Sequence, residues 1–177
     1  INTSTEINDR PCAFRYPRGT GLGSILPSIN EKIEIGKSKI IKEGKKLAIL
    51  NFGARLNETL KAAENLLKKG VPITVVDARF AKPLDENLIW QLATTHEAIM
   101  TIEEGSIGGF GSHVVNFLTK KGLMDSNLKF RSLTLPDIFI DQDTPDKMYK
   151  VANLDSVSIE EKVLDLLNSN IVLKKQS

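Results

Sequence analysis

The fold is decided by the stretch Ile99-Met100-Thr101-Ile102-Glu103-Glu104-Gly105-Ser106-Ile107-Gly108-Gly109-Phe110-Gly111-Ser112-His113-Val114-Val115. An apolar run ends in two carboxylates, a loop with four glycines follows, and apolar residues then return at helical spacing. This order predicts a buried strand, a tight crossover loop and a helix. Glycine lacks a Cβ, so it suits positions where the backbone turns sharply or approaches another group closely. We therefore expect the stretch to form the centre of an α/β sheet, with a group packed or bound at its loop.

Strand-like and helix-like segments alternate on both sides of this stretch. Besides the central strand at 98–103, the pattern predicts strands at residues 37–42, 46–52, 73–78 and 129–135. Helices are expected at residues 57–69, 85–95, 114–121, 144–151 and 159–167, with N-caps at Asn57, Asp85 and Thr144 and with Gly70 and Gly122 ending two of them. Such alternation predicts a mostly parallel, doubly wound five-stranded sheet with flanking helices.

Composition excludes several classes of function. The 177 residues carry a net charge of +2, so no basic surface for nucleic acid or an anionic membrane is expected. The single cysteine cannot form an internal disulfide, and no apolar run approaches the roughly 18 residues that a membrane helix needs. We expect a reducing, cytoplasmic location. The chain begins with isoleucine and a polar stretch without signal-peptide character, which suggests part of a longer protein.

The glycine loop does not fit a dinucleotide-binding fingerprint. Gly109 and Gly111 are followed by Val114 where the third glycine would stand, and no acidic residue ends the next strand. Glu103 and Glu104 are adjacent, so on a strand they point to opposite faces and cannot form a facing acid–base pair. The favoured interpretation is structural: a carboxylate caps helix N–H groups at the carboxyl end of the sheet.

The two histidines and the cysteine show no catalytic or metal-ligand pattern. His96 precedes a strand, whereas His113 falls in the first turn of a helix, where the N–H groups disfavour an imidazolium. A histidine in that first turn is expected to be neutral and either packed or at the surface. Cys12 has no activating neighbour and is expected to be a small buried hydrophobic residue.

The segment Arg15-Tyr16-Pro17-Arg18-Gly19 has two possible interpretations. The arginines could be a solvated pair, or a proline-stiffened loop could position a guanidinium for a phosphate or carboxylate. An extended segment places Arg15 and Arg18 on opposite sides, and a structural role is favoured for Arg15. The segment from Pro11 to Tyr16 is expected to form a short strand.

Several strings occur in an order that resembles a known family. They are residues 15–19, Leu47-Ala48-Ile49-Leu50-Asn51-Phe52-Gly53, Asp77-Ala78-Arg79-Phe80-Ala81-Lys82-Pro83-Leu84-Asp85, residues 103–113 and Leu135-Pro136-Asp137-Ile138-Phe139-Ile140. Together they resemble the carboxyl-terminal part of the 1-deoxy-D-xylulose-5-phosphate synthase family, within the transketolase-like enzymes. The resemblance runs from Pro11 to the last helix.

The resemblance implies a thiamine-diphosphate-dependent transferase. Such an enzyme decarboxylates pyruvate and joins the two-carbon unit to D-glyceraldehyde 3-phosphate, and its product feeds isoprenoid, thiamine and pyridoxal synthesis. Thiamine diphosphate and Mg²⁺ would be bound by domains that precede this chain. No catalytic, cofactor-binding or metal-binding residue is therefore expected here, and the isolated chain is expected to bind neither group and to be inactive.

The resemblance also implies a domain organisation and one substrate-binding residue. Residues 1–23 would end a pyrimidine-binding domain with its last strand, residues 24–35 would be a linker, and residues 36–177 would be the carboxyl-terminal domain of a homodimeric enzyme. Arg18 would meet the phosphate of glyceraldehyde 3-phosphate. Two alternatives stay open: the terminal domain of a 2-oxoacid dehydrogenase first-component beta subunit, and a non-catalytic binding or oligomerisation module.

Overall fold

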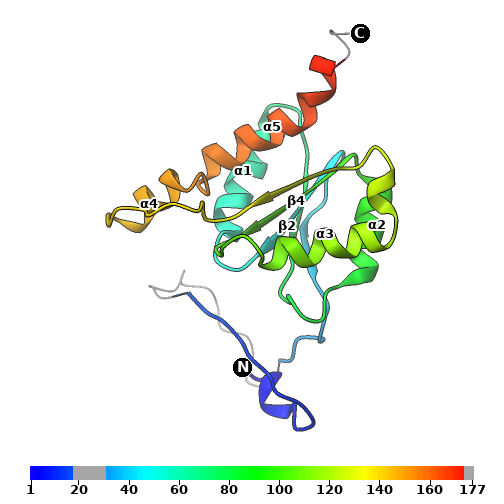
Figure 1. Ribbon diagram of the computed structural model, residues 1–177, viewed down its shortest axis with the longest axis vertical. Coiled ribbons are helices and arrows are strands. Elements are labelled where there is room, and N and C mark those ends of the chain that lie inside the picture. The colour runs from blue at the N-terminus through cyan, green and yellow to red at the C-terminus, as the bar shows by residue number, and fades with distance from the viewer. Residues whose placement is uncertain (18–30, 174–177) are drawn as a thin grey trace.

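A computed structural model describes residues 1–17 and 31–173 of the chain. At its centre lies a five-stranded sheet (Figure 1). The strands lie in the order β1-β3-β2-β4-β5. Four strands are parallel, and β1 pairs antiparallel with β3 at one edge. The strands are β1 (Lys39–Lys42), β2 (Leu47–Phe52), β3 (Thr74–Asp77), β4 (Ala98–Glu103) and β5 (Lys129–Leu133). The predicted fold class, a mostly parallel five-stranded sheet with flanking helices, is confirmed.

Helices cover both faces of the sheet (Figure 1). The first layer contains α1 (Leu56–Lys68) and α5 (Ser156–Leu173), and the second contains α2 (Glu86–Thr95) and α3 (Phe110–Lys120). The short helix α4 (Pro145–Val151) lies beside the carboxyl ends of the strands, and two 3₁₀ turns span Ser4–Glu6 and Leu123–Asp125. No helix in the described part of the chain is long and apolar enough to cross a membrane.

The core follows from the alternation of side chains along the central strands. In β2, Leu47 and Ile49 pack in the layer of α1 and α5, whereas Ala48 and Leu50 pack in the layer of α2 and α3. All four are at most 1% exposed. A strand that is covered on both faces needs apolar residues at every position, which explains the unbroken apolar run.

The helix boundaries confirm most of the predicted caps. The Asp85 carboxylate accepts from the Leu88 N–H and starts α2 as predicted. Gly70 follows the end of α1 with a φ of +77°, a conformation that costs glycine little.

The prediction that Asn57 caps α1 is wrong, because the N-cap is Arg55. The Thr59 N–H donates to the Arg55 carbonyl at 3.0 Å, so the first turn begins at Arg55, and the Thr59 hydroxyl lies 3.1 Å from the Asn51 side-chain oxygen of β2.

Two predictions for the amino-terminal segment are also wrong. Residues 11–16 form no strand, and Cys12 is exposed rather than buried. A strand requires a neighbouring strand to complete its backbone hydrogen bonds, and none of the described strands pairs with this segment. Residues 11–17 are all exposed, so Cys12 has no apolar surroundings.

Candidate functional site

The connectivity of the sheet marks the place where a site is expected. The chain leaves β2 through α1 toward β3 on one side, and it leaves β4 through α3 toward β5 on the other. In open α/β sheets, ligands bind in the crevice that forms where neighbouring strands diverge in this way, outside their carboxyl ends. Here that position is the carboxyl ends of the neighbouring strands β2 and β4 (Figure 1). Phe52 and Glu103 are paired there in the strand register.

Glu103 ends β4 and is only 3% exposed. Its two carboxylate oxygens accept hydrogen bonds from the Phe110 and Gly111 N–H groups, each at 2.9 Å. These N–H groups begin α3 and have no acceptor within the helix. A carboxylate is favoured there because the helix dipole is positive at this end. The predicted capping role of a carboxylate in this stretch is confirmed, and it belongs to Glu103.

The glycines of the loop make room for side chains of the same chain. A Cβ on Gly109 would lie 2.3 Å from a Glu103 carboxylate oxygen, and one on Gly105 would lie 2.9 Å from it. At Gly111, a Cβ would lie 2.3 Å from the Ser132 hydroxyl oxygen and 2.6 Å from that of Thr101. The group that was expected to pack at the loop is therefore the carboxylate of Glu103, with a pair of strand hydroxyls beside it.

Glu104 points to a different part of the molecule and makes a second polar cluster. Its carboxylate accepts a hydrogen bond from the Tyr149 hydroxyl of α4. The Arg55 guanidinium lies over the Tyr149 ring, 3.4 Å from its centroid. Burial and the carboxylate of Glu104 together raise the pKa of Tyr149 to about 12. Within the described part of the chain, the buried Nε of Arg55 has no hydrogen-bond partner.

The amino-terminal segment reaches the same edge of the sheet. The Arg15 guanidinium lies 5.8 Å from the centroid of the Phe52 ring, and that ring stacks on Phe110 at 5.0 Å. This contact agrees with a structural role for Arg15. Arg18, the predicted substrate-binding residue, lies outside the described residues, so its role stays a prediction.

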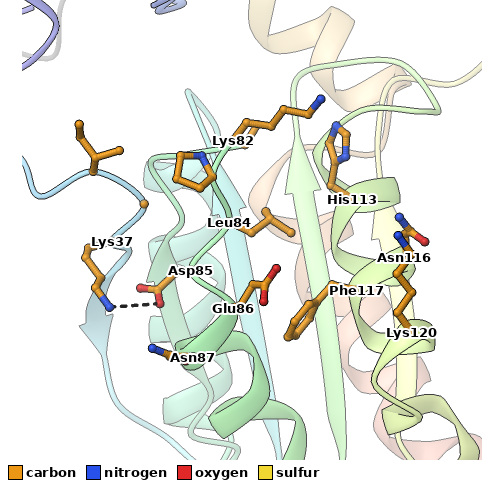
Figure 2. A pocket seen from close by; sticks show the side chains of 14 residues that line it. Lys37, Lys82, Leu84, Asp85, Glu86, Asn87, His113, Asn116, Phe117 and Lys120 are labelled. Carbon is orange, nitrogen blue, oxygen red and sulfur yellow. Dashed lines mark ion pairs between the residues drawn. The ribbon is translucent and has the colours of Figure 1, made fainter. Parts of the chain in front are cut away.

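A second candidate is a pocket of about 580 Å³ between the start of α2 and one face of α3 (Figure 2). Figure 2 shows Lys82 and His113 at one end of the pocket and Glu86 between the two helices. Phe117 contributes an apolar wall. The Lys37 ammonium lies 4.0 Å from the Asp85 carboxylate, whose oxygens also accept backbone N–H groups. The pocket combines both signs of charge with apolar surface, which suits a small polar molecule without selecting one reaction.

The histidines do not contribute to a catalytic cluster. In His96, Nε2 lies 2.9 Å from the Thr74 hydroxyl and Nδ1 lies 2.9 Å from the Thr95 hydroxyl. Burial lowers the pKa of His96, which favours the neutral ring. His113 is half-buried in the first turn of α3. Among the residues that the structure describes, no three histidine, cysteine or acidic side chains are grouped as metal ligands.

Arg55 and Tyr149, which form a cluster with Glu104, were not identified from the sequence. Arg55 follows β2 at its carboxyl end, and this position was a usable signal. Tyr149 carried no local signal, because its partners Glu104 and Arg55 are 45 and 94 residues away in the sequence.

Comparisons with known proteins agree with this architecture. The family model described as "Transketolase, C-terminal domain" matches residues 36–159. A solved structure described as "Split gene transketolase, inactive beta4 tetramer" superposes with a TM-score of 0.71 at 27% sequence identity. The match covers 82% of this chain and 46% of that one, so the present chain spans less than half the length of its structural neighbour.

Proposed function

The chain belongs to the transketolase C-terminal domain family, and on that premise we propose that it is the carboxyl-terminal part of a thiamine-diphosphate-dependent transferase. The match over residues 36–159 is the observation that carries this proposal. The described residues form a packed scaffold in which polar groups bond to one another, as when Glu103 accepts hydrogen bonds from the start of α3. The cofactor and a divalent metal ion would then be held by the domains ahead of this one.

The proposed reaction is that of 1-deoxy-D-xylulose-5-phosphate synthase. Thiamine diphosphate, when bound, would supply the carbanion chemistry for pyruvate decarboxylation and transfer of the two-carbon unit to D-glyceraldehyde 3-phosphate. The ordered strings at residues 15–19, 77–85 and 135–140 support this member of the superfamily over its relatives. A homodimeric, cytoplasmic enzyme, with domain boundaries near residues 23 and 36, belongs to the same proposal.

Arg18 is proposed to bind the phosphate of the acceptor substrate. A guanidinium binds a phosphate through two parallel hydrogen bonds and holds the aldehyde by a group remote from the reacting carbon. The assignment rests on the resemblance of residues 15–19, in which Arg18 matches the family's phosphate-binding arginine.

The test uses the complete enzyme with Arg18→Ala. Loss of charge-assisted hydrogen bonds worth about 1.5–3 kcal/mol lowers kcat/KM for glyceraldehyde 3-phosphate about 10- to 100-fold. Turnover with unphosphorylated D-glyceraldehyde stays as it is in the wild type. Arg10→Ala is the matched control, because Arg10 is exposed and pairs with Asp9. Unchanged acceptor kinetics in Arg18→Ala would refute the assignment.

Product analysis separates the proposed enzyme from its alternatives. The complete enzyme, given pyruvate, glyceraldehyde 3-phosphate, Mg²⁺ and thiamine diphosphate, is expected to form 1-deoxy-D-xylulose 5-phosphate. A 2-oxoacid dehydrogenase component would instead transfer an acetyl group to a lipoyl carrier. The chain of residues 1–177 alone is expected to show no turnover, and turnover by it would contradict the placement of the catalytic residues upstream.

A further inference from the structure

Three large apolar side chains are exposed on loops that follow β4 and β5. Ile107 is 75% exposed, Ile138 is 62% exposed and Phe139 is fully exposed. Both loops leave the carboxyl ends of parallel neighbouring strands, so they lie at the same edge of the sheet. Apolar groups that gather at one edge of a domain are typical of a surface that another protein surface covers.

The loop that carries Ile138 and Phe139 is anchored at both ends. Before it, the Leu135 N–H donates to the Gly105 carbonyl at 2.8 Å, and Leu135 packs against the core. After Phe139, Ile140 packs against the same core cluster. The exposed pair is thus presented outward between two partly buried attachment points, and its exposure is built into the fold.

The charges around this loop indicate the chemistry of the partner. Asp137, Asp141, Asp143 and Asp146 are all exposed. Only Asp143 has an ion pair among the described residues, with Lys147 at 3.2 Å. Apolar side chains with carboxylates next to them along the chain complement a surface that is apolar and carries basic residues.

The amino-terminal segment indicates where that partner comes from. Arg15 lies over the Phe52 ring at the carboxyl end of β2, so this part of the segment ahead of the domain lies at the same edge. Its neighbours Phe14 and Tyr16 are 53% and 81% exposed. Exposed aromatic side chains therefore lie both on this segment and on the edge that it approaches.

We propose that Ile107, Ile138 and Phe139, with the surrounding aspartates, form the surface on which the preceding domains of the same enzyme dock. This inference rests on the proposed function, because it requires the chain to be part of a longer transferase. The occupant is an apolar surface with basic residues around it, and docking fixes this domain beside the catalytic part.

Hydrogen exchange measured by mass spectrometry tests the proposal without any substitution. Backbone amides of residues 105–109 and 136–141 are expected to exchange at least 10-fold more slowly in the complete enzyme than in the chain of residues 1–177. Equal rates would overturn the proposal. It would also fail if slow exchange appeared in the isolated chain and increased with its concentration, since a second copy would then be the occupant.

A variant pair gives a second readout. In the complete enzyme, the double change Ile138→Ser and Phe139→Ser is expected to restore fast exchange at residues 105–109, whereas Val157→Ser, on exposed α5 surface, is not. Unchanged protection in the double variant would contradict the proposal. Protected loops in an enzyme that makes no deoxyxylulose phosphate would refute the proposed reaction but not the docking surface. Unprotected loops in an enzyme that does make deoxyxylulose phosphate would refute only the docking surface.

Discussion

The capping of α3 by Glu103 can be tested by a thermodynamic cycle with Gly109. Replacing Glu103 by alanine removes two hydrogen bonds of 2.9 Å and leaves the Phe110 and Gly111 N–H groups buried without an acceptor. Hydrogen bonds to a charged group contribute about 1.5–3 kcal/mol each, so the expected loss of unfolding free energy for the two is about 3–6 kcal/mol. For a urea slope of about 2 kcal/mol/M, the midpoint falls by roughly 2 M.

The second side of the cycle uses the space that Gly109 leaves. An alanine Cβ there would lie 2.3 Å from a Glu103 oxygen, an overpacking that costs about 1–3 kcal/mol. In the Glu103→Ala background the oxygen is gone, so Gly109→Ala should cost less by about that amount. Any backbone cost of alanine at residue 109 is common to both backgrounds and cancels in the cycle.

Urea unfolding, followed by circular dichroism, measures all four corners of the cycle. Glu104→Ala provides the control, because Glu104 bonds Tyr149 and not the start of α3. Its effect should add to that of Gly109→Ala within about 0.5 kcal/mol. If Gly109→Ala destabilises the Glu103→Ala protein as much as the wild type, the carboxylate is not what the glycine accommodates, and the explanation of the loop is wrong.

Three further predictions concern caps and titrating groups. Asp85→Ala should lower the unfolding free energy by about 1–2 kcal/mol in urea melts, because the Leu88 N–H loses its acceptor, while Asp85→Asn retains part of the stability. Burial and Glu104 raise the pKa of Tyr149 to about 12, so the stability that this neutral tyrosine contributes should be lost as the pH rises from 10 through 12. The absorbance of the Tyr149 phenolate can be measured as the difference from Tyr149→Phe. It should titrate at lower pH in Glu104→Gln. Burial lowers the pKa of His96, so the unfolded chain binds more protons than the folded one, and stability should fall as the pH drops below about 6.5. His96→Gln should flatten that part of the pH profile of thermal unfolding.

The central strands were predictable because their sequence carries the whole signal. The structure places β4 at residues 98–103, as predicted, and β2 begins one residue later than expected. A strand between two helix layers must be apolar on both faces, so its composition marks it whatever its neighbours are. The Asp85 cap was predictable for a similar reason, because its acceptor and donor are three residues apart in the sequence.

The predictions that failed depended on contacts between distant residues. Asn57 looks like an N-cap, but α1 starts at Leu56, and the first turn is tied to the core by a hydrogen bond from the Thr59 hydroxyl to the Asn51 side-chain oxygen. Residues 11–16 have strand-like composition, yet composition supplies no partner strand. The stacking of Arg55 on Tyr149 joins residues far apart in the chain, which no local pattern reveals.

The start of α3 has a consequence for how this protein can handle anions. All four amides of the first turn already have acceptors: Phe110 and Gly111 donate to Glu103, whereas Ser112 and His113 donate to the Gly109 carbonyl. The protein thus carries its own internal anion where many α/β proteins receive a phosphate from solvent. A glycine-rich loop after a strand does not identify a nucleotide enzyme when a glutamate of the same chain occupies that place.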